Sequence, residues 1–226
     1  MPKPYQIFIG CPYRTAIRKL YDRLKQEIEA DTPLAFVLAD TGAITSAQYL
    51  LLHISEKIQD SIGCIFEVTG GNPNVSLEVG IAHTFPVDYL IAMNTRKPRT
   101  RIEREAEKMA KSEGEVQPII ADLQGKVRIE YKTFDSLKKQ IVSRYLSGIP
   151  FMHRWEKFKR DQTALVPHAL KIFAEIRTHG RTQFPRVASL LDGTGIKPKD
   201  LSHALSKEKL LTVRMGRGGG YYYPQK

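Results

Sequence analysis

Short apolar segments that alternate with helical segments dominate residues 5–147, and this alternation constrains the fold more than any other feature. The runs at residues 7–9, 34–38 and 62–68 contain few polar side chains, whereas residues 15–29 repeat apolar positions at helical spacing. Strands that are apolar on both faces are typical of a parallel sheet with helices on each side. The sequence therefore predicts an α/β fold built on a parallel sheet of about five strands.

A second region begins near Pro150, where the alternation of strands and helices ends. Beyond a boundary stretch at residues 151–160, short helical segments lead into β runs joined by a glycine-rich turn. The helices are predicted at residues 164–179, 184–191 and 197–210, and the β runs at residues 211–215 and 221–224. This order of elements is typical of a winged helix. The sequence thus predicts an α/β domain at residues 1–149 and a winged-helix domain at residues 150–226.

Positive charge is concentrated in the second region. The whole chain has a formal net charge of +11, and residues 151–226 hold 15 Lys and Arg against 6 Asp and Glu, a net of +9. The first 150 residues hold the other 20 against 18, a net of +2. A basic excess in one domain favours an anionic partner, so we expect the winged helix to contact nucleic-acid phosphates. The expected contact residues are Lys197, Lys199, His203, Lys207, Arg214 and Arg217. Docking of a protein partner is the alternative.

Loops that follow the predicted strands should meet at one edge of the sheet. Right-handed crossovers place the ligand crevice of such a fold beyond the carboxyl ends of its strands. The segments expected there are residues 10–13, 40–42 and 69–74 and Asn94. Beyond Asn94, residues 99–112 are expected to form a charged helix or lid, and residues 119–122 a further short strand.

Residues 69–83 form the most informative segment, in which a glycine-rich loop leads into a helix. We expect Asn74 to cap this helix, whose first amides and positive dipole end would suit a phosphate or ribose hydroxyls. Glu78 lies four residues beyond the expected cap, where its carboxylate would point back toward the crevice. A carboxylate there can stabilise an oxocarbenium-like centre, attack it, or hold ribose hydroxyls. A solvated surface glutamate is the alternative.

The same segment carries a resemblance to a known family. The string N-P-N-V-S-L-E-V-G-I-A at residues 72–82 resembles the signature of the TIR-like and nucleoside 2-deoxyribosyltransferase-like superfamily. Weaker similarities lie in I-F-I-G-C-P-Y at residues 7–13 and in I-I-A-D-L-Q-G-K-V-R-I-E-Y at residues 119–131, so the resemblance spans residues 5–147. It implies a flavodoxin-like, doubly wound sheet. It also places Glu78 on the glutamate that serves catalytic members as nucleophile or ribose-binding carboxylate.

The resemblance and the loop positions together suggest which residues surround the substrate. The expected substrate-binding residues are Gly10, Cys11, Tyr13, Asp60, Thr69, Asn72 and Asn74. Asp60 precedes the third strand, where the deoxyribosyltransferases carry an acidic residue, and a role in the turn is the alternative. The second active-site aspartate of those enzymes has no clear counterpart, because Leu52, His53 and Glu56 occupy that part of the chain. Base exchange is therefore not expected. The two activities that remain compatible with the sequence are hydrolysis of NAD or a nucleotide, and binding of it without turnover.

These features lead to a functional hypothesis. The chain is expected to be an N-glycosidase-type effector that cleaves NAD or another nucleotide, with a winged helix that couples it to nucleic acid or a partner complex. The resemblance implies a setting in antiviral, anti-phage defence. The alternative is a non-enzymatic regulator that senses a nucleotide and binds DNA.

Composition also leads to expectations about cofactors, metals and membrane association. No cofactor or metal is expected beyond the nucleotide, since Cys11 and Cys64 have no neighbouring His or CxxC partner. No stretch approaches the roughly 20 apolar residues of a membrane span, so we expect a cytoplasmic protein. Homo-oligomer formation is left open.

Overall fold

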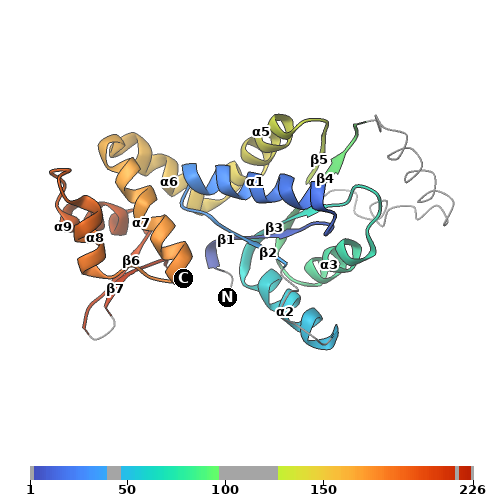
Figure 1. The fold of residues 1–226 in the computed structure, drawn as a ribbon, viewed down its shortest axis with the longest axis horizontal. Helices are drawn as coiled ribbons and strands as arrows, with labels where there is room; N and C mark the ends of the chain where they lie inside the picture. Colours follow the sequence, from blue (N-terminus) through green and yellow to red (C-terminus); the bar gives the residue numbers. More distant parts are fainter. Residues whose placement is uncertain (1–2, 40–46, 97–126, 217–218, 225–226) are drawn as a thin grey trace.

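Five parallel strands form the central sheet of the protein (Figure 1). The computed structural model describes residues 3–39, 47–96, 127–216 and 219–224. The strands are β1 (Lys3–Gly10), β2 (Ala35–Leu38), β3 (Ser61–Glu67), β4 (Asp88–Asn94) and β5 (Val127–Tyr131). They lie in the order β2-β1-β3-β4-β5, and each neighbouring pair is parallel. The predicted α/β fold with a parallel sheet is confirmed, and the strand order is that of flavodoxin-like proteins.

Helices cover both faces of the sheet, because apolar side chains alternate between the faces along each strand. The helices of this region are α1 (Thr15–Asp31), α2 (Ala47–Gln59), α3 (Pro73–Thr84) and α5 (Phe134–Arg144). On β1, Ile7 and Ile9 lie in the hydrophobic cluster that includes α1 and α5, whereas Phe8 lies in the cluster that includes α2 and α3. Figure 1 shows these two pairs of helices on opposite sides of the sheet.

Helices and a small antiparallel hairpin form the C-terminal region. They are α6 (Pro150–Asp161), α7 (Val166–His179), α8 (Phe184–Leu191), α9 (Pro198–Lys207), β6 (Thr212–Arg214) and β7 (Gly220–Tyr222), with 3-10 turns η2 (Leu146–Gly148) and η3 (Thr163–Leu165). β6 pairs with β7, and Thr182, between α7 and α8, forms an isolated bridge with Tyr221. The predicted helices and β runs after residue 160 are therefore present, with ends shifted by a few residues.

The two regions share one hydrophobic core. Residues 151–160, which the sequence marks as a boundary, form most of α6, and the Trp155 and Phe158 side chains are fully buried. The cluster around α1 continues through α6 into α7 and the hairpin. The indole Nε1 of Trp155 also donates to the Asp31 carbonyl at 3.3 Å. The charged face of α6 makes the stretch look like a linker, but its other face is apolar and joins the two regions.

Polar contacts and ring stacking reinforce this junction. The ring of Tyr223 stacks on Tyr5 with 3.8 Å between the ring centroids, and its hydroxyl donates to the Pro33 carbonyl at 2.7 Å. Arg177 of α7 donates hydrogen bonds to three carbonyls around the loop from α1 to β2, those of Glu29, Thr32 and Leu34. The C-terminal region is therefore anchored on the end of α1.

Several predicted features lie outside the described residues: the turn at residues 40–42, the charged helix at 99–112, the strand at 119–122, and Arg217. Within the described ranges, no helix has both the length and the apolar character needed to cross a lipid bilayer.

Candidate functional site

The carboxyl ends of β1 and β3 form the point at which the fold favours a ligand site. β1 lies between β2 and β3, so the chain leaves β1 toward one side of the sheet and later continues on the other side. Ligands of open α/β sheets bind at such a switch point. β1 ends at Gly10 and β3 at Glu67, and the following loops hold Cys11, Tyr13 and Thr69. The topology thus brings these predicted residues to one edge.

Glu78 of α3 lies at this switch point with its side chain buried, and only 5% of its surface is exposed. A Cβ atom at Gly10 would lie 2.2 Å from Glu78 Oε2 and 2.5 Å from Phe66 Cδ1. The carboxyl group therefore rests against the glycine at the end of β1. Within the described part of the chain, Glu78 Oε2 has no hydrogen-bond partner. Glycine is needed at position 10 because any side chain would displace this carboxyl group.

Burial sets the protonation state of Glu78. Loss of hydration disfavours the ionised form and raises the pKa of the carboxyl group from 4.5 to about 8. The group is therefore mostly neutral at pH 7. A neutral carboxyl group can donate a proton or a hydrogen bond, and a positive charge beside it would favour ionisation. Buried polar groups of structural importance are normally hydrogen-bonded, so an unpaired one at a ligand-binding edge is a candidate for chemistry.

Glu67 at the end of β3 is a second buried carboxylate, and sequence reasoning overlooked it. Its side chain is fully buried and accepts hydrogen bonds from the hydroxyls of Tyr21 at 2.8 Å and Tyr131 at 2.7 Å. The backbone amide of Thr69 donates to it at 3.0 Å, and the Thr69 hydroxyl donates as well. The same hydroxyl accepts from the Asn94 amide at 2.6 Å. Glu67 therefore fixes the loop that leads toward α3.

The two glutamates have opposite environments. Burial raises the pKa of Glu67, but the hydrogen bonds from Thr69, Tyr131 and Tyr21 oppose that shift by favouring the carboxylate. Glu78 has no such donors among the described residues. The carboxylate of Glu67 is thus held by its donors and stabilises the loop, whereas Glu78 Oε2 is left without a donor among the described residues. The sequence signal for Glu67 was its position as a polar residue at the end of an apolar strand. Its tyrosine partners could not be predicted, because they come from α1 and β5, which are distant in sequence.

The start of α3 differs from the sequence expectation. Asn72, not Asn74, caps the helix, and its Oδ1 accepts from the amides of Asn74 at 3.0 Å and Val75 at 3.3 Å. Pro73 is the first helical residue, where its missing N–H and fixed φ are tolerated, so the cap falls one residue earlier than Pro73. The prediction of Asn74 as the cap was therefore wrong. The amides expected to bind a phosphate are already occupied by Asn72.

The start of α1 is the other helix N-terminus at this edge. Arg14 precedes the helix without forming a side-chain cap, and no acidic residue lies in the first turn. Arg14 Nη1 lies 3.9 Å from the position that a Cβ of Gly70 would take. This cation thus lies between the loops that follow β1 and β3. Amide donors at a helix start beside an arginine suit a phosphate group.

The remaining predicted residues fall into two groups. Tyr13 is exposed at the edge, and its hydroxyl donates to the Ala39 carbonyl at 3.3 Å. Cys11 is buried there, and desolvation raises the pKa of its thiol to about 12, so it is neutral. Asp60 precedes β3 and lies at the opposite, amino end of the strand, where it pairs with Lys3 at 2.8 Å. It therefore does not join the other predicted residues, because the length of β3 separates them.

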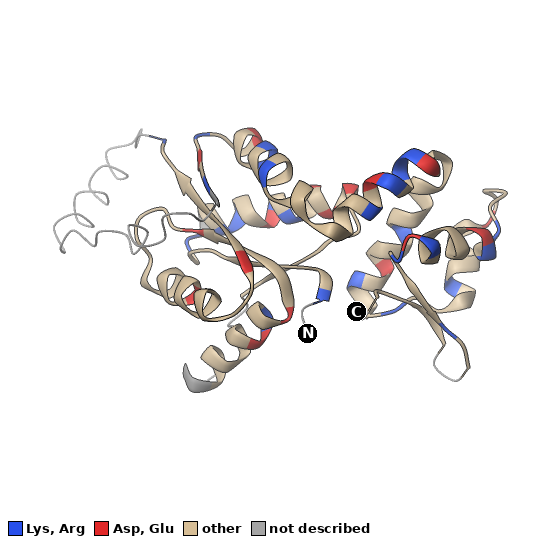
Figure 2. Cartoon of the chain, turned by 180° about the vertical axis from the view of Figure 1, so that it is seen from behind, with Lys and Arg blue, Asp and Glu red and all other residues tan. Residues whose placement is uncertain are grey.

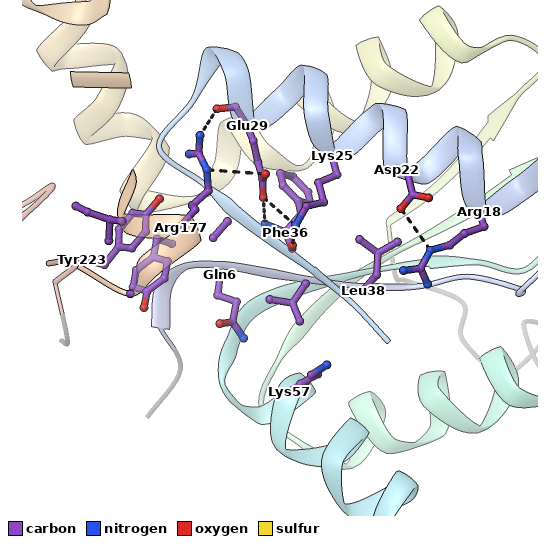
Figure 3. A pocket seen from close by; sticks show the side chains of 15 residues that line it. Gln6, Arg18, Asp22, Lys25, Glu29, Phe36, Leu38, Lys57, Arg177 and Tyr223 are labelled. Carbon is purple, nitrogen blue, oxygen red and sulfur yellow. Dashed lines mark hydrogen bonds and ion pairs between the residues drawn. The ribbon is translucent and has the colours of Figure 1, made fainter. Parts of the chain in front are cut away.

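A groove of about 510 Å³ runs along the open edge of β2, and Glu78 is not part of its lining (Figure 3). Charged side chains of α1 cover the outward-facing backbone of the strand there. Lys25 Nζ donates to the Phe36 carbonyl at 2.5 Å, and the Phe36 amide donates to Glu29 Oε1 at 2.7 Å. An edge strand whose polar groups are occupied is protected from pairing with another strand. These contacts account for the groove as part of the fold.

The predicted nucleic-acid contacts that the structure describes are exposed on α9 and around it. Lys199, His203 and Lys207 recur every four residues and form one stripe along α9. Lys197 immediately precedes the helix, and Arg214 lies on β6. Figure 2 shows Lys and Arg spread over the C-terminal helices and hairpin.

The ranges that the structure describes contain no cluster of three or more His, Cys, Asp or Glu residues that could hold a metal ion.

The chain matches no known protein family and no curated protein sequence. Among solved structures, it is similar to translation elongation factor SelB from Methanococcus maripaludis in complex with the GTP analogue GppNHp, at 14% sequence identity and a TM-score of 0.41. The similarity covers 66% of this chain and 35% of the elongation factor. The chain therefore spans about a third of that protein's length, and so distant a likeness carries no functional argument. No family match supports the resemblance to TIR-like or deoxyribosyltransferase-like proteins.

Proposed function

We propose that the α/β region binds NAD or another nucleotide across the carboxyl end of its sheet and cleaves the N-glycosidic bond with Glu78. The observation that carries this proposal is the buried carboxyl group of Glu78, which lies against Gly10 at the switch point between β1 and β3 and whose Oε2 has no hydrogen-bond partner among the described residues. The start of α1 and Arg14 would hold the phosphates. These groups approach the switch point from both faces of the sheet.

The proposed chemistry uses the ionised form of Glu78. Cleavage of an N-glycosidic bond develops positive charge at C1′ of the ribose, and a carboxylate beside it stabilises that charge or captures the carbon. In the resting protein, desolvation keeps the group mostly neutral because its pKa is about 8. A ligand that brings positive charge next to Glu78 would lower this pKa and produce the reactive carboxylate when the substrate is in place.

A C-terminal winged helix that binds nucleic acid completes the proposal. Three consecutive helices, α7 to α9, followed by the β6–β7 hairpin support this assignment, as does the bridge from Thr182 to the hairpin. The stripe of Lys199, His203 and Lys207 would contact phosphates. Because the region is anchored on α1, it would present nucleic acid at a fixed position relative to the nucleotide site.

A regulator that binds a nucleotide without turnover is the second candidate. The observation that favours it is the neutral state of Glu78 at pH 7, since a neutral carboxyl group can donate a hydrogen bond to a ligand but cannot attack it. In that case the winged helix would bind DNA in response to the nucleotide.

Incubation of the purified protein with NAD and a panel of nucleotides, with released base followed by chromatography, tests the proposal. Glu78→Gln should lower turnover by roughly 100-fold or more, as the loss of a key electrostatic group does. Glu156→Gln is the matched control, because Glu156 lies on α6 with a side chain 52% exposed. Equal turnover by the Glu78 variant would reject its role. Nucleotide binding without turnover by the wild type would select the regulator.

A further inference from the structure

The small C-terminal sheet has an inner and an outer face. Thr182 bridges Tyr221, which pairs with Val213, so three chain segments lie side by side. Side chains alternate between the faces of such a sheet. Tyr221 and Tyr223 point inward, with 4% and 6% of their surfaces exposed. Tyr222 therefore lies on the outer face and is only half-buried.

Two arginines flank Tyr222 on the outer face. Tyr222 pairs with Thr212, and Arg214 lies two residues further along the same strand, hence on the same face. Arg214 Cζ is 4.9 Å from the centroid of the Tyr222 ring, and Arg181 Nη1 donates to the Tyr222 hydroxyl at 3.3 Å. We call Arg181, Tyr222 and Arg214 the outer-face cluster. Its tyrosine holds two guanidinium groups in defined positions.

A groove of about 370 Å³ adjoins this cluster at the corner between α7 and α8. Its lining residues are Glu175, His179, Arg181, Thr182, Gln183 and Arg186. Glu175 pairs with Arg186 at 2.6 Å, so the charge of its carboxylate is compensated. Arg181 belongs to both the groove and the outer-face cluster. The two features therefore form one continuous surface in which cations outnumber the carboxylate.

We propose that this surface binds a single-stranded nucleic acid, with a phosphate in the corner groove and a base stacked beside Tyr222. The proposal rests on the proposed nucleic-acid function of the C-terminal region and adds a second contact surface to the α9 stripe. Arg181 would contact a phosphate. The guanidinium plane of Arg214, supported by the Tyr222 ring, would provide the stacking surface for a base.

The single-stranded form is favoured because the cluster combines charge with an aromatic ring. The bases of a duplex stack on one another, so only an unpaired base can lie on a protein ring or guanidinium plane. The α9 stripe contains Lys199, His203 and Lys207, which suit the phosphates of a duplex instead. The two surfaces thus predict separate responses to single-stranded and duplex probes.

Fluorescence anisotropy with the full chain tests this assignment, using a labelled oligo(dT) and a labelled duplex of the same length. Tyr222→Ala removes the ring that supports the Arg214 guanidinium plane, so it should weaken oligo(dT) binding by at least about 5-fold, the lower end of the range for one base stack. Arg214→Lys should also weaken it, because lysine keeps the charge but lacks the plane. Tyr222→Phe keeps the ring but loses the hydroxyl that accepts from Arg181, so it should bind oligo(dT) more tightly than Tyr222→Ala does. Glu156→Gln, on α6 with a side chain 52% exposed, is the control and should stay within about 3-fold of the wild type.

Salt dependence and the α9 stripe complete the experiment. Arg181→Gln should reduce the slope of log affinity for oligo(dT) against log salt by about 0.7, the value for one lost phosphate contact on a single strand. Lys199→Ala combined with Lys207→Ala should weaken duplex binding more than oligo(dT) binding. Circular dichroism melts of each variant show whether it is folded.

The outcomes separate the two proposals. The inference is overturned if folded Arg214→Lys and Tyr222→Ala proteins bind oligo(dT) as the wild type does, while the α9 variant loses affinity for both probes. In that case nucleic-acid binding stands and α9 alone carries it. If the folded wild type binds neither probe at low salt, the nucleic-acid function itself fails, and a protein partner becomes the better account of this region.

Discussion

Replacing Glu78 by glutamine should make the protein more stable, by an amount that grows with pH. The Glu78 side chain is 5% exposed, and its Oε2 lacks a hydrogen-bond partner in the described part of the chain. Glutamine has nearly the same shape but does not ionise. The substitution therefore removes the cost of keeping a titratable group out of water and leaves the packing against Gly10 unchanged.

The magnitude follows from the raised pKa. Each pH unit between the unfolded and folded pKa values changes the free energy of unfolding by about 1.4 kcal/mol. The pKa of Glu78 is raised from 4.5 to about 8, so within this window the folded state keeps a proton that the unfolded chain has released. The contribution of Glu78 to the free energy of unfolding is therefore fully present below pH 4.5 and is lost as the pH rises toward 8. The variant should be more stable by about 1 kcal/mol at pH 5 and about 3 kcal/mol at pH 7.

Urea unfolding at pH 5, 6, 7 and 8 measures this difference. Trp155 is the single tryptophan of the chain and lies in the shared core, so its fluorescence reports on the junction of the two regions. Glu156→Gln is the control for the same substitution at a solvent-exposed position, because that side chain is 52% exposed. A Glu78→Gln difference that stays constant from pH 5 to 8 would refute the reasoning, since it would mean that Glu78 is already ionised or solvated in the folded state.

Four further outcomes are expected. If the ionised form of Glu78 is reactive, kcat/KM should rise with pH and level off above about 8, and a profile that falls over this range would contradict the proposed chemistry. Glu67→Gln should lower the free energy of unfolding at pH 7 by about 1–3 kcal/mol in urea titrations, opposite in sign to the change at Glu78, because an amide nitrogen cannot accept from its donors. Gly10→Ala should cost about 1–3 kcal/mol in the same assay and abolish nucleotide binding, because its Cβ would meet Glu78 Oε2 at 2.2 Å; unchanged binding would place the ligand elsewhere. Arg177→Ala should lower stability by about 1–3 kcal/mol by removing the donor to three carbonyls, and an unchanged Trp155 fluorescence transition would show that the junction does not depend on it.

The candidate site was predictable only where a local pattern signals it. The segment at residues 72–82 and the order of strands and helices were enough to expect Glu78 at the carboxyl edge of the sheet. Asn72 could have been recognised as the cap, because the proline that follows it occupies the first helical position. Asp60 could not be placed by its neighbours in sequence. Its position depends on which end of β3 it adjoins, and it adjoins the amino end.

The sequence by itself determined the parallel sheet, the positions of most helices and the concentration of positive charge after residue 150, because burial and periodicity are encoded within each segment. Tertiary structure alone decided the states of the two buried glutamates. The donors of Glu67 come from α1 and β5, and the desolvation of Glu78 comes from α3 packing against the end of β1. The outer-face cluster likewise joins Arg181 to residues of the distant hairpin. Protonation and ligand binding depend on groups that are close in space, and folding brings them together from distant parts of the chain.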